Sequence, residues 1–138
     1  MDTIQAAILL VKFDLFRDEI LLRNNAANFY NKELKKICDL ITIPFISKNN
    51  TSVYAQYTLL TDDRDSLIYK LSQYNIPTAI HYPVPIHKQP AYTEKKLNLP
   101  ISESVSKKVL SIPISPYITK EDQSAVIRAI ELWCKNQK

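Results

Sequence analysis

The sequence predicts an α+β protein in which helices pack on a short, largely antiparallel three-stranded sheet, preceded by a long N-terminal helical segment. Its 138 residues are one domain's worth of chain, and 46% hydrophobic with 23% charged residues is ordinary for a soluble globular protein. Apolar residues recur at helical spacing in some stretches and alternate in others. No repeat, low-complexity tract or long linker interrupts these stretches. Their order therefore predicts one small layer of helices on a sheet.

The first expected element is a helical segment from residue 2 to about residue 37. Its apolar residues recur at four-three-four spacing along one side: Ile4, Ile8, Val11 and Leu15. Further alanine and leucine residues fill the other side, so we expect this segment to be buried on more than one face. Asp14 is predicted to cap a second helix within the segment, whose last turn carries Lys35 and Lys36.

Four short stretches are predicted to be extended. Residues 41–46 form a short extended segment that a proline interrupts, and residues 53–60 present two alternating sets of side chains, as a strand does. A short strand is expected over residues 78–80, and an edge strand between prolines over residues 112–114. The last three of these stretches are the predicted strands of the sheet.

Helices are expected between and after these strands. One runs to about residue 73 and is capped by Thr61 or Asp62. A brief helix is predicted to be capped by Ser102. The last helix is predicted to begin at Thr119, with an aspartate three residues on as a variant of the capping box.

The chain contains no glycine. Walker loops, Rossmann GxGxxG turns and GxSxG nucleophile elbows need backbone positions that only glycine fills, so these sites are excluded from this chain. Phosphate contacts would have to use side chains, helix N-termini or a partner's backbone. Asn75 directly follows a predicted helix, and Asn is the next best residue for the left-handed turn that closes a helix.

Residues 78–92 hold both histidines of the chain, together with three prolines and two tyrosines. Proline fixes its own φ and favours extended geometry at the preceding residue, so the stretch predicts a stiff loop and neither a helix nor a central strand. His81 and Tyr82 follow a predicted strand and carry donors suited to an anion such as a diphosphate. The alternative is a purely structural connector. No metal site is expected, because the loop contains no Cys, Asp or Glu.

The two cysteines, Cys38 and Cys134, lie far apart, each near the end of a predicted helix. Free thiols in a reducing cytosol are expected, while a disulfide between them stays open as an alternative. A Cys–His nucleophile is not expected, because both cysteines lie at the wrong edge of the pattern for an imidazole partner.

The formal net charge of +4 and the pI near 9.0 are mildly basic. No nucleic-acid-binding motif accompanies this charge, so no nucleic acid partner is expected. The lysine pairs are interpreted as solvated faces: Lys35–Lys36, Lys95–Lys96 and Lys107–Lys108. The longest apolar run, residues 6–11, is too short to span a bilayer, and the N-terminus lacks the features of a secretion signal. We therefore expect a cytoplasmic protein with no membrane partner.

Four stretches of the sequence, in order and at compatible spacing, resemble the C-terminal portion of the DegT/DnrJ/StrS family of sugar-nucleotide aminotransferases. They read MDTIQAAILLVK from residue 1, YAQYTLL from residue 54, TAIHYPVPIHKQPAY from residue 78 and VLSIPISPYIT from residue 109. The resemblance implies the small C-terminal domain of a fold type I aminotransferase. It divides the chain into residues 1–38, a helical segment linking to a large pyridoxal-phosphate (PLP) domain and the dimer interface, and residues 39–138, a small α+β domain.

The resemblance also implies an activity and a set of substrate-binding residues. Enzymes of this family use PLP to convert a keto nucleotide-sugar to an amino sugar, commonly with glutamate as the amino donor. Residues matching His81 and Tyr82 would face the nucleotide diphosphate. His87 and Gln89 are further candidates near the same mouth, with loop-bracing hydrogen bonds as their alternative role.

No catalytic or cofactor-binding residue is assigned in this chain. In the family, the PLP-bearing lysine lies before the point at which this sequence begins, and no lysine here has a matching context. We therefore expect the isolated chain to be inactive, and to act as a homodimer or paired with a PLP-bearing large domain. The alternatives are a non-catalytic dimerisation or interaction module and one half of a split enzyme. The sugar, its carbon position and the nucleotide are not determined by the sequence.

Overall fold

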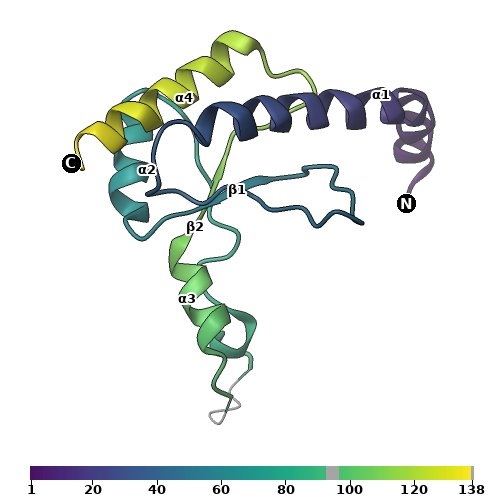
Figure 1. Cartoon of the computed structure of the whole chain (residues 1–138). Helices are drawn as coiled ribbons and strands as arrows, with labels where there is room; N and C mark the ends of the chain where they lie inside the picture. The colour runs from purple at the N-terminus through teal and green to yellow at the C-terminus, as the bar shows by residue number, and fades with distance from the viewer. Residues whose placement is uncertain (93–96, 138) are drawn as a thin grey trace.

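The computed structural model describes residues 1–92 and 97–137, so the predicted Lys95–Lys96 face lies outside the described residues. Its elements follow one another in the order α1 (Thr3–Leu34), β1 (Tyr57–Leu60), α2 (Arg64–Ser72), the 3₁₀ turn η1 (Ile86–Lys88), α3 (Pro100–Lys108), β2 (Val109–Ile112) and α4 (Lys120–Lys135). In Figure 1, α1 and α4 lie on one side of the two short strands, and α3 projects from the other side. The expected α+β class is confirmed.

Helix α1 is one continuous helix of 32 residues. The Asp2 side chain caps it by accepting a hydrogen bond from the Gln5 N–H at 2.8 Å. The predicted break at Asp14 is wrong, because this residue lies inside the helix. The segment contains neither proline nor glycine, so nothing interrupts its backbone hydrogen bonds.

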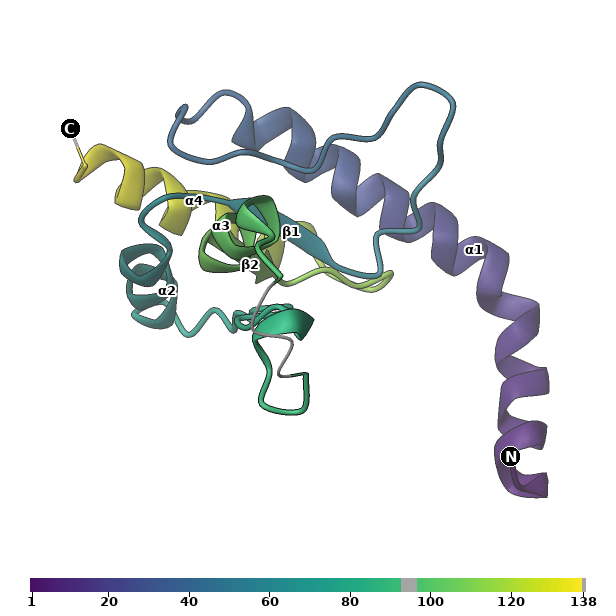
Figure 2. The ribbon, with the colours of Figure 1, turned by 90° about the horizontal axis from the view of Figure 1, so that it is seen from below.

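Only the C-terminal part of α1 packs into the core, through Ala26, Ala27, Tyr30 and Leu34. The N-terminal part extends away from the rest of the chain (Figure 2). Its large apolar side chains are exposed: Ile4, Ile8, Leu9, Leu10, Val11, Phe13, Leu15 and Phe16. The predicted burial on more than one face is therefore not met within this chain.

The sheet is smaller than the sequence predicts. Strands β1 and β2 pair antiparallel, from Tyr57 opposite Ile112 to Leu60 opposite Val109. The predicted strand over 53–60 begins only at Tyr57, and the predicted edge strand over 112–114 lies instead at 109–112.

Two of the predicted extended stretches contribute only single bridges to this sheet. One joins Thr42 to Leu60, and the other joins Ala79 to Ser111. Both backbone hydrogen bonds of the Ala79 bridge form, at 3.1 and 2.8 Å. On one side of this bridge, the next hydrogen-bonded pair in that register would be Pro77 opposite Pro113, and neither residue has an N–H to donate. On the other side it would be His81 opposite Val109, whose N–H is already bonded to the Val105 carbonyl at the end of α3. The third strand is therefore reduced to a bridge.

The core lies where α1, α2 and α4 meet the two strands. Its largest fully buried side chains are Tyr30, Leu34, Tyr57, Leu59, Leu67, Leu71, Leu110 and Ile130. The buried phenol of Tyr30 donates to the Pro113 carbonyl at 3.0 Å, and that of Tyr57 donates to Asn31 Oδ1 at 2.7 Å. Burial raises the pKa of both tyrosines above the ordinary value. The Gln123 side chain, also buried, donates to the Ala26 carbonyl at 2.9 Å and ties α4 to α1.

The ends of the remaining helices test the predicted caps. Asn75 has φ 55°, which confirms the left-handed turn after α2. Thr119 is the N-cap of α4, as predicted. Asp63 is the N-cap residue of α2, in place of Thr61 or Asp62. The predicted Ser102 cap is wrong, because α3 already begins at Pro100, a residue whose fixed φ and missing N–H suit the first helical position.

The α4 cap leads to a stability prediction. The Thr119 hydroxyl accepts the Asp122 N–H at 3.0 Å and donates to the Asp122 carboxylate at 2.7 Å. We expect Thr119→Ala to lower the free energy of unfolding by about 1 kcal/mol, measured by urea unfolding, because an orphan helix donor loses its partner. Ser124→Ala is the matched control, since this exposed hydroxyl lies within the same helix. Equal losses in both variants would contradict the cap.

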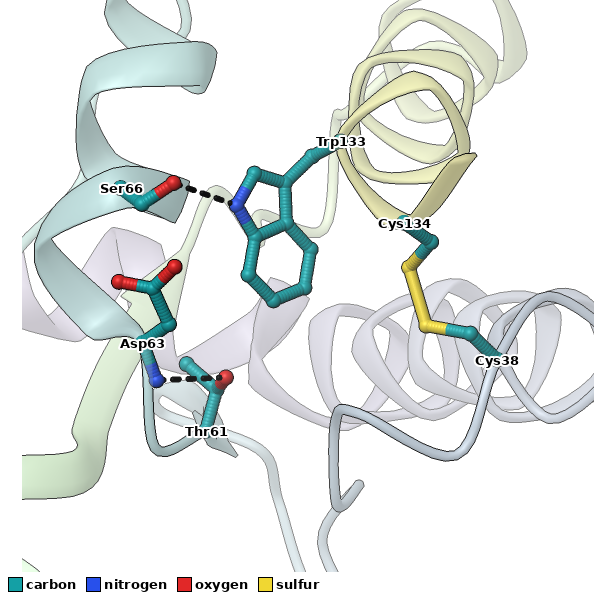
Figure 3. Close-up of a disulfide and its surroundings, with 6 residues drawn as sticks. All are labelled: Cys38, Thr61, Asp63, Ser66, Trp133 and Cys134. Atoms are coloured by element: carbon teal, nitrogen blue, oxygen red, sulfur yellow. Dashed lines mark hydrogen bonds between the residues drawn. A yellow bond between two sulfur atoms is a disulfide. The ribbon is translucent and has the colours of Figure 1, made fainter. Parts of the chain in front are cut away.

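The cysteines form a disulfide between Cys38, just beyond α1, and Cys134 in α4, with Cα atoms 6.3 Å apart. Figure 3 shows this bond beside Trp133, whose indole N–H donates to Ser66 Oγ at 2.9 Å. The expectation of free thiols is therefore wrong, and the disulfide alternative is the one observed. The sequence offered no sign that packing α4 against the end of α1 brings these two positions together.

Within the described part of the chain, no helix combines the length and the apolar character needed to cross a membrane.

Candidate functional site

The loop with both histidines leaves the sheet at the Ala79–Ser111 bridge. His81 and Tyr82 come directly after this bridge, at the edge of the sheet, and both side chains are exposed. Their rings meet edge to face, with centroids 5.5 Å apart, and the peptide bond between them is cis. Tyr82 is 72% exposed, so its phenol is free to contact a molecule outside the chain.

A cleft of about 450 Å³ lies between this loop and α3. The loop wall includes His81, Tyr82 and Gln89, and α3 contributes Ser102, Val105 and Ser106 to the opposite wall. The structure thus brings three of the four predicted substrate-binding residues to one cleft. The cleft combines apolar side chains with imidazole, phenol, amide and hydroxyl groups, a mixture typical of small-molecule sites.

His87, the fourth predicted residue, does not line this cleft. Its side chain is only 6% exposed, and its Nε2 lies 3.0 Å from Glu103 Oε1 on α3. Lys88 Nζ lies 3.2 Å from the same oxygen. This geometry is that of the loop-bracing alternative, and Glu103 is the residue that the sequence analysis missed. The sequence provided only an indirect indication of Glu103: a histidine in a packed loop needs a polar partner, but the sequence does not say which residue supplies it.

The contacts of Glu103 with His87 and Lys88 favour the charged form of its carboxyl group. The contact with His87, followed by that with Lys88, lowers the pKa of the Glu103 carboxyl below its ordinary value. Because the folded pKa lies below the unfolded one, the contact stabilises the fold above the usual carboxyl range. This stabilisation is lost as the pH falls through the lowered pKa.

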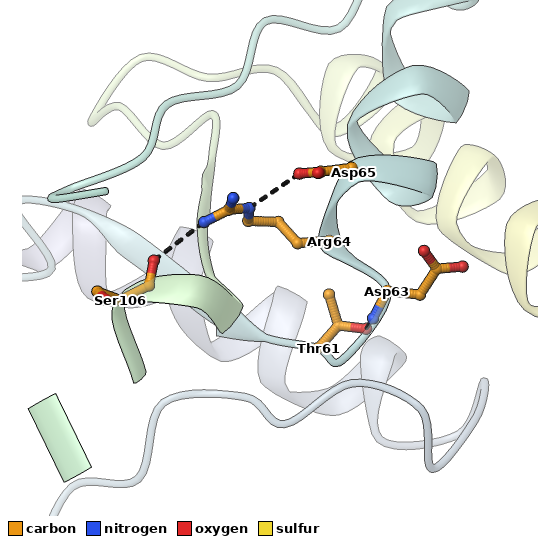
Figure 4. Close-up of polar contacts among 5 residues, drawn as sticks. All are labelled: Thr61, Asp63, Arg64, Asp65 and Ser106. Carbon is orange, nitrogen blue, oxygen red and sulfur yellow. Dashed lines mark hydrogen bonds and ion pairs between the residues drawn. The ribbon is translucent and has the colours of Figure 1, made fainter. Parts of the chain in front are cut away.

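The α3 wall of the cleft is itself anchored. Arg64, at the start of α2, donates to the Ser106 carbonyl at 3.0 Å and to Asp65 Oδ1 at 3.2 Å (Figure 4). The Ser106 hydroxyl donates back to the Glu103 carbonyl at 3.0 Å. The arginine side chain is 17% exposed, so these bonds are partly shielded from water. The wall opposite the loop is therefore connected to the core through α2.

The clefts formed by residues 1–92 and 97–137 do not fit a PLP site. Such a site needs a free lysine amine and donors for a phosphate. No lysine lines the cleft with His81. A second cleft, of about 390 Å³, holds Lys108, but its Nζ lies 2.6 Å from Asp62 Oδ1, and further aspartates line the same cleft. Carboxylates there would repel a phosphate. In residues 1–92 and 97–137, no three His, Cys, Asp or Glu side chains group in a way that could hold a metal ion.

Comparison with known proteins gives one family. The model of the DegT/DnrJ/EryC1/StrS aminotransferase family matches residues 1–131. The UDP-2-acetamido-2-deoxy-3-oxo-D-glucuronate aminotransferase of Pseudomonas aeruginosa is 46% identical over 118 residues, which is 86% of this chain and 32% of that protein. The dTDP-3-amino-3,6-dideoxy-alpha-D-galactopyranose transaminase of Aneurinibacillus thermoaerophilus is 34% identical over 131 residues, 94% of this chain and 36% of that protein.

Solved structures show the same relation. The S. venezuelae DesV structure, in complex with a ketimine intermediate, superposes with a TM-score of 0.92 at 31% identity and covers 98% of this chain and 37% of that one. A DegT DnrJ EryC1 StrS aminotransferase from Brucella abortus superposes with a TM-score of 0.88 at 38% identity, covering 96% and 36%. The chain thus spans about a third of the length of the relatives it matches.

Proposed function

Because the chain belongs to the DegT/DnrJ/EryC1/StrS aminotransferase family, we propose that it is the C-terminal, substrate-facing domain of a PLP-dependent aminotransferase. The proposed reaction converts the keto group of a nucleotide sugar to an amine, with glutamate as the amino donor. Two relatives are named as transaminases of a UDP-linked or dTDP-linked sugar, which supports a nucleotide-sugar substrate. The observation that carries the proposal is the exposed His81–Tyr82 edge of a cleft, while none of the clefts described above fits PLP.

In this proposal, the chain binds and orients the nucleotide sugar. The His81 imidazole and the Tyr82 phenol donate hydrogen bonds to the diphosphate, and the Gln89 amide contributes at the same mouth. The edge-to-face contact between the two rings restricts their rotation, so less conformational entropy is lost when the ligand binds. PLP and its lysine would belong to polypeptide outside this chain, and no chemical step is assigned to the residues described here.

The exposed apolar residues of α1 support a second part of the proposal. Phe13 is 73% exposed and Val11 is 70% exposed, and large apolar patches of this kind mark interfaces. We propose that residues 1–38 connect the small domain, residues 39–138, to the PLP-bearing part and to a second copy in a dimer. The same helix also favours the alternative function, a non-catalytic dimerisation module or one half of a split enzyme.

A complementation experiment tests the proposal. The chain is co-expressed with the part of the P. aeruginosa relative that lies outside the match. We expect the pair to transfer an amino group to UDP-2-acetamido-2-deoxy-3-oxo-D-glucuronate, measured by mass spectrometry of the sugar product. Neither polypeptide alone should do so. Incubating this chain alone with PLP and borohydride should leave no stoichiometric lysine adduct, because the lysines that line clefts of the described residues are each paired with a carboxylate: Lys36, Lys108 and Lys135.

The outcomes separate the candidates. A stoichiometric PLP adduct on one lysine of the isolated chain would refute the proposed division of roles. Stable assembly without amino transfer or nucleotide binding would favour the interaction module. Restored amino transfer in the mixture supports the aminotransferase function, whether the enzyme is one polypeptide or split into two, and excludes the non-catalytic module.

A further inference from the structure

The cleft beside His81 and Tyr82 has walls from two segments that are distant in the sequence. One wall is the loop up to Gln89, and the other is α3. The spacing of the walls therefore depends on what joins the loop to the helix. Arg64 anchors the helix side through the Ser106 carbonyl, so the loop is the wall that needs a tether.

Up to residue 92, the loop has few polar connections to the other described residues. At its start, the Ala79 bridge holds it to Ser111. Beyond this bridge, the backbone hydrogen bonds of the loop are local, such as Lys88 N–H to the Pro85 carbonyl at 2.9 Å and Gln89 N–H to the Ile86 carbonyl at 3.0 Å. Up to residue 92, the side-chain bonds that reach another element of the described chain are those of His87 and Lys88 to Glu103.

We propose that Glu103 is a positioning residue whose carboxylate clamps the η1 turn to α3 and so sets the spacing of the cleft walls. The clamp joins residues that are close in sequence to those lining the cleft. Glu103 follows Ser102 of the α3 wall, and His87 precedes Gln89 of the loop wall by two positions. One carboxylate oxygen receives both the imidazole and the ammonium, and the histidine side chain is almost fully covered. Charge-assisted bonds of this kind are stronger than neutral ones. This inference rests on the proposed function only for the identity of the ligand.

The clamp is tested first on this chain alone. Glu103→Ala removes both bonds, whereas Glu103→Gln keeps an acceptor oxygen but loses the charge. Hydrogen exchange of the Lys88 and Gln89 amides and the ¹⁵N resonances of the His87 ring are measured. We expect exchange to accelerate about tenfold in the Ala variant and less in the Gln variant, together with changed imidazole resonances. Glu121→Ala is the matched control, because this exposed glutamate lies in the first turn of α4, distant from the cleft.

The second arm uses the complemented enzyme and UDP-2-acetamido-2-deoxy-3-oxo-D-glucuronate. Glu103→Ala should raise KM for the sugar about fivefold to tenfold with kcat retained, because it displaces groups that bind substrate and touches no reacting atom. Unchanged exchange and imidazole resonances would overturn the clamp, whatever the enzyme does. Faster hydrogen exchange in the loop with an unchanged KM would overturn the positioning role of Glu103. If the complemented enzyme is inactive with the wild-type chain, the proposed function fails, and exchange and resonances alone decide the clamp.

Discussion

Replacing Cys38 and Cys134 together with alanine is expected to lower the free energy of unfolding by about 2 to 5 kcal/mol. The two residues are 96 positions apart, so the disulfide closes a loop that includes most of the chain and restricts the unfolded state strongly. Alanine is preferred to serine because Cys134 is 2% exposed, and a hydroxyl there would need a partner. Since domains of this size are stable by only about 5 to 15 kcal/mol, the loss is large. Urea unfolding of both proteins measures it.

The same experiment has an internal control. Adding dithiothreitol should move the wild-type unfolding midpoint towards that of the double variant and leave the double variant unchanged. Thiol titration of the unreduced protein in denaturant should find no free thiols. Two free thiols in that titration, or a wild-type unfolding midpoint that does not change when dithiothreitol is added, would contradict the disulfide in solution.

The second large effect concerns the rings at the cleft mouth. His81→Ala and Tyr82→Phe, each introduced into the complemented enzyme, are expected to weaken nucleotide-sugar binding by about 10-fold to 100-fold. In the proposed site, each change removes a hydrogen-bond donor to a charged diphosphate, and bonds of this kind contribute about 1.5 to 3 kcal/mol. Isothermal titration with the sugar nucleotide measures the affinity.

Tyr69→Phe is the matched control for the phenol. Tyr69 lies on α2 and is 67% exposed. Its substitution by phenylalanine removes the same hydroxyl group at a site outside the clefts described above. We expect its affinity to equal that of the wild type. If His81→Ala and Tyr82→Phe also leave affinity and turnover untouched, the proposed substrate-facing role is wrong.

The features that the sequence predicted well depend on neighbouring residues. The Thr119 cap acts over three positions, and Asn75 closes α2 with the residue type that, after glycine, best suits a left-handed turn. The proline-rich stretch was correctly predicted to lack an α-helix and a central strand, apart from the single 3₁₀ turn at Ile86–Lys88. The predicted break at Asp14 was wrong because a local signal was given too much weight. An aspartate that suits a helix cap is also tolerated inside an exposed helix.

The candidate site was predicted only in part. His81, Tyr82 and Gln89 share a cleft, but nothing in the loop indicated that α3 would form the other wall. Glu103 lies 16 positions from His87, and no local rule pairs a carboxylate with an imidazole at that distance along the chain. The sheet was overestimated for a similar reason, since the facing prolines at 77 and 113 are recognised only once the register is known.

By itself, the sequence determined the α+β class, the start of α4 at Thr119 and the turn at Asn75, the stiff loop with its two histidines, and the resemblance to a sugar-nucleotide aminotransferase family. The tertiary structure alone decided that the cysteines are joined, that Glu103 braces the loop, and that the apolar N-terminal part of α1 is left uncovered in this chain. The physical reason is the separation along the sequence of the residues that interact. Caps and turns depend on bonds within a few residues, whereas a disulfide, a clamp or a buried face depends on which distant segments packing brings together.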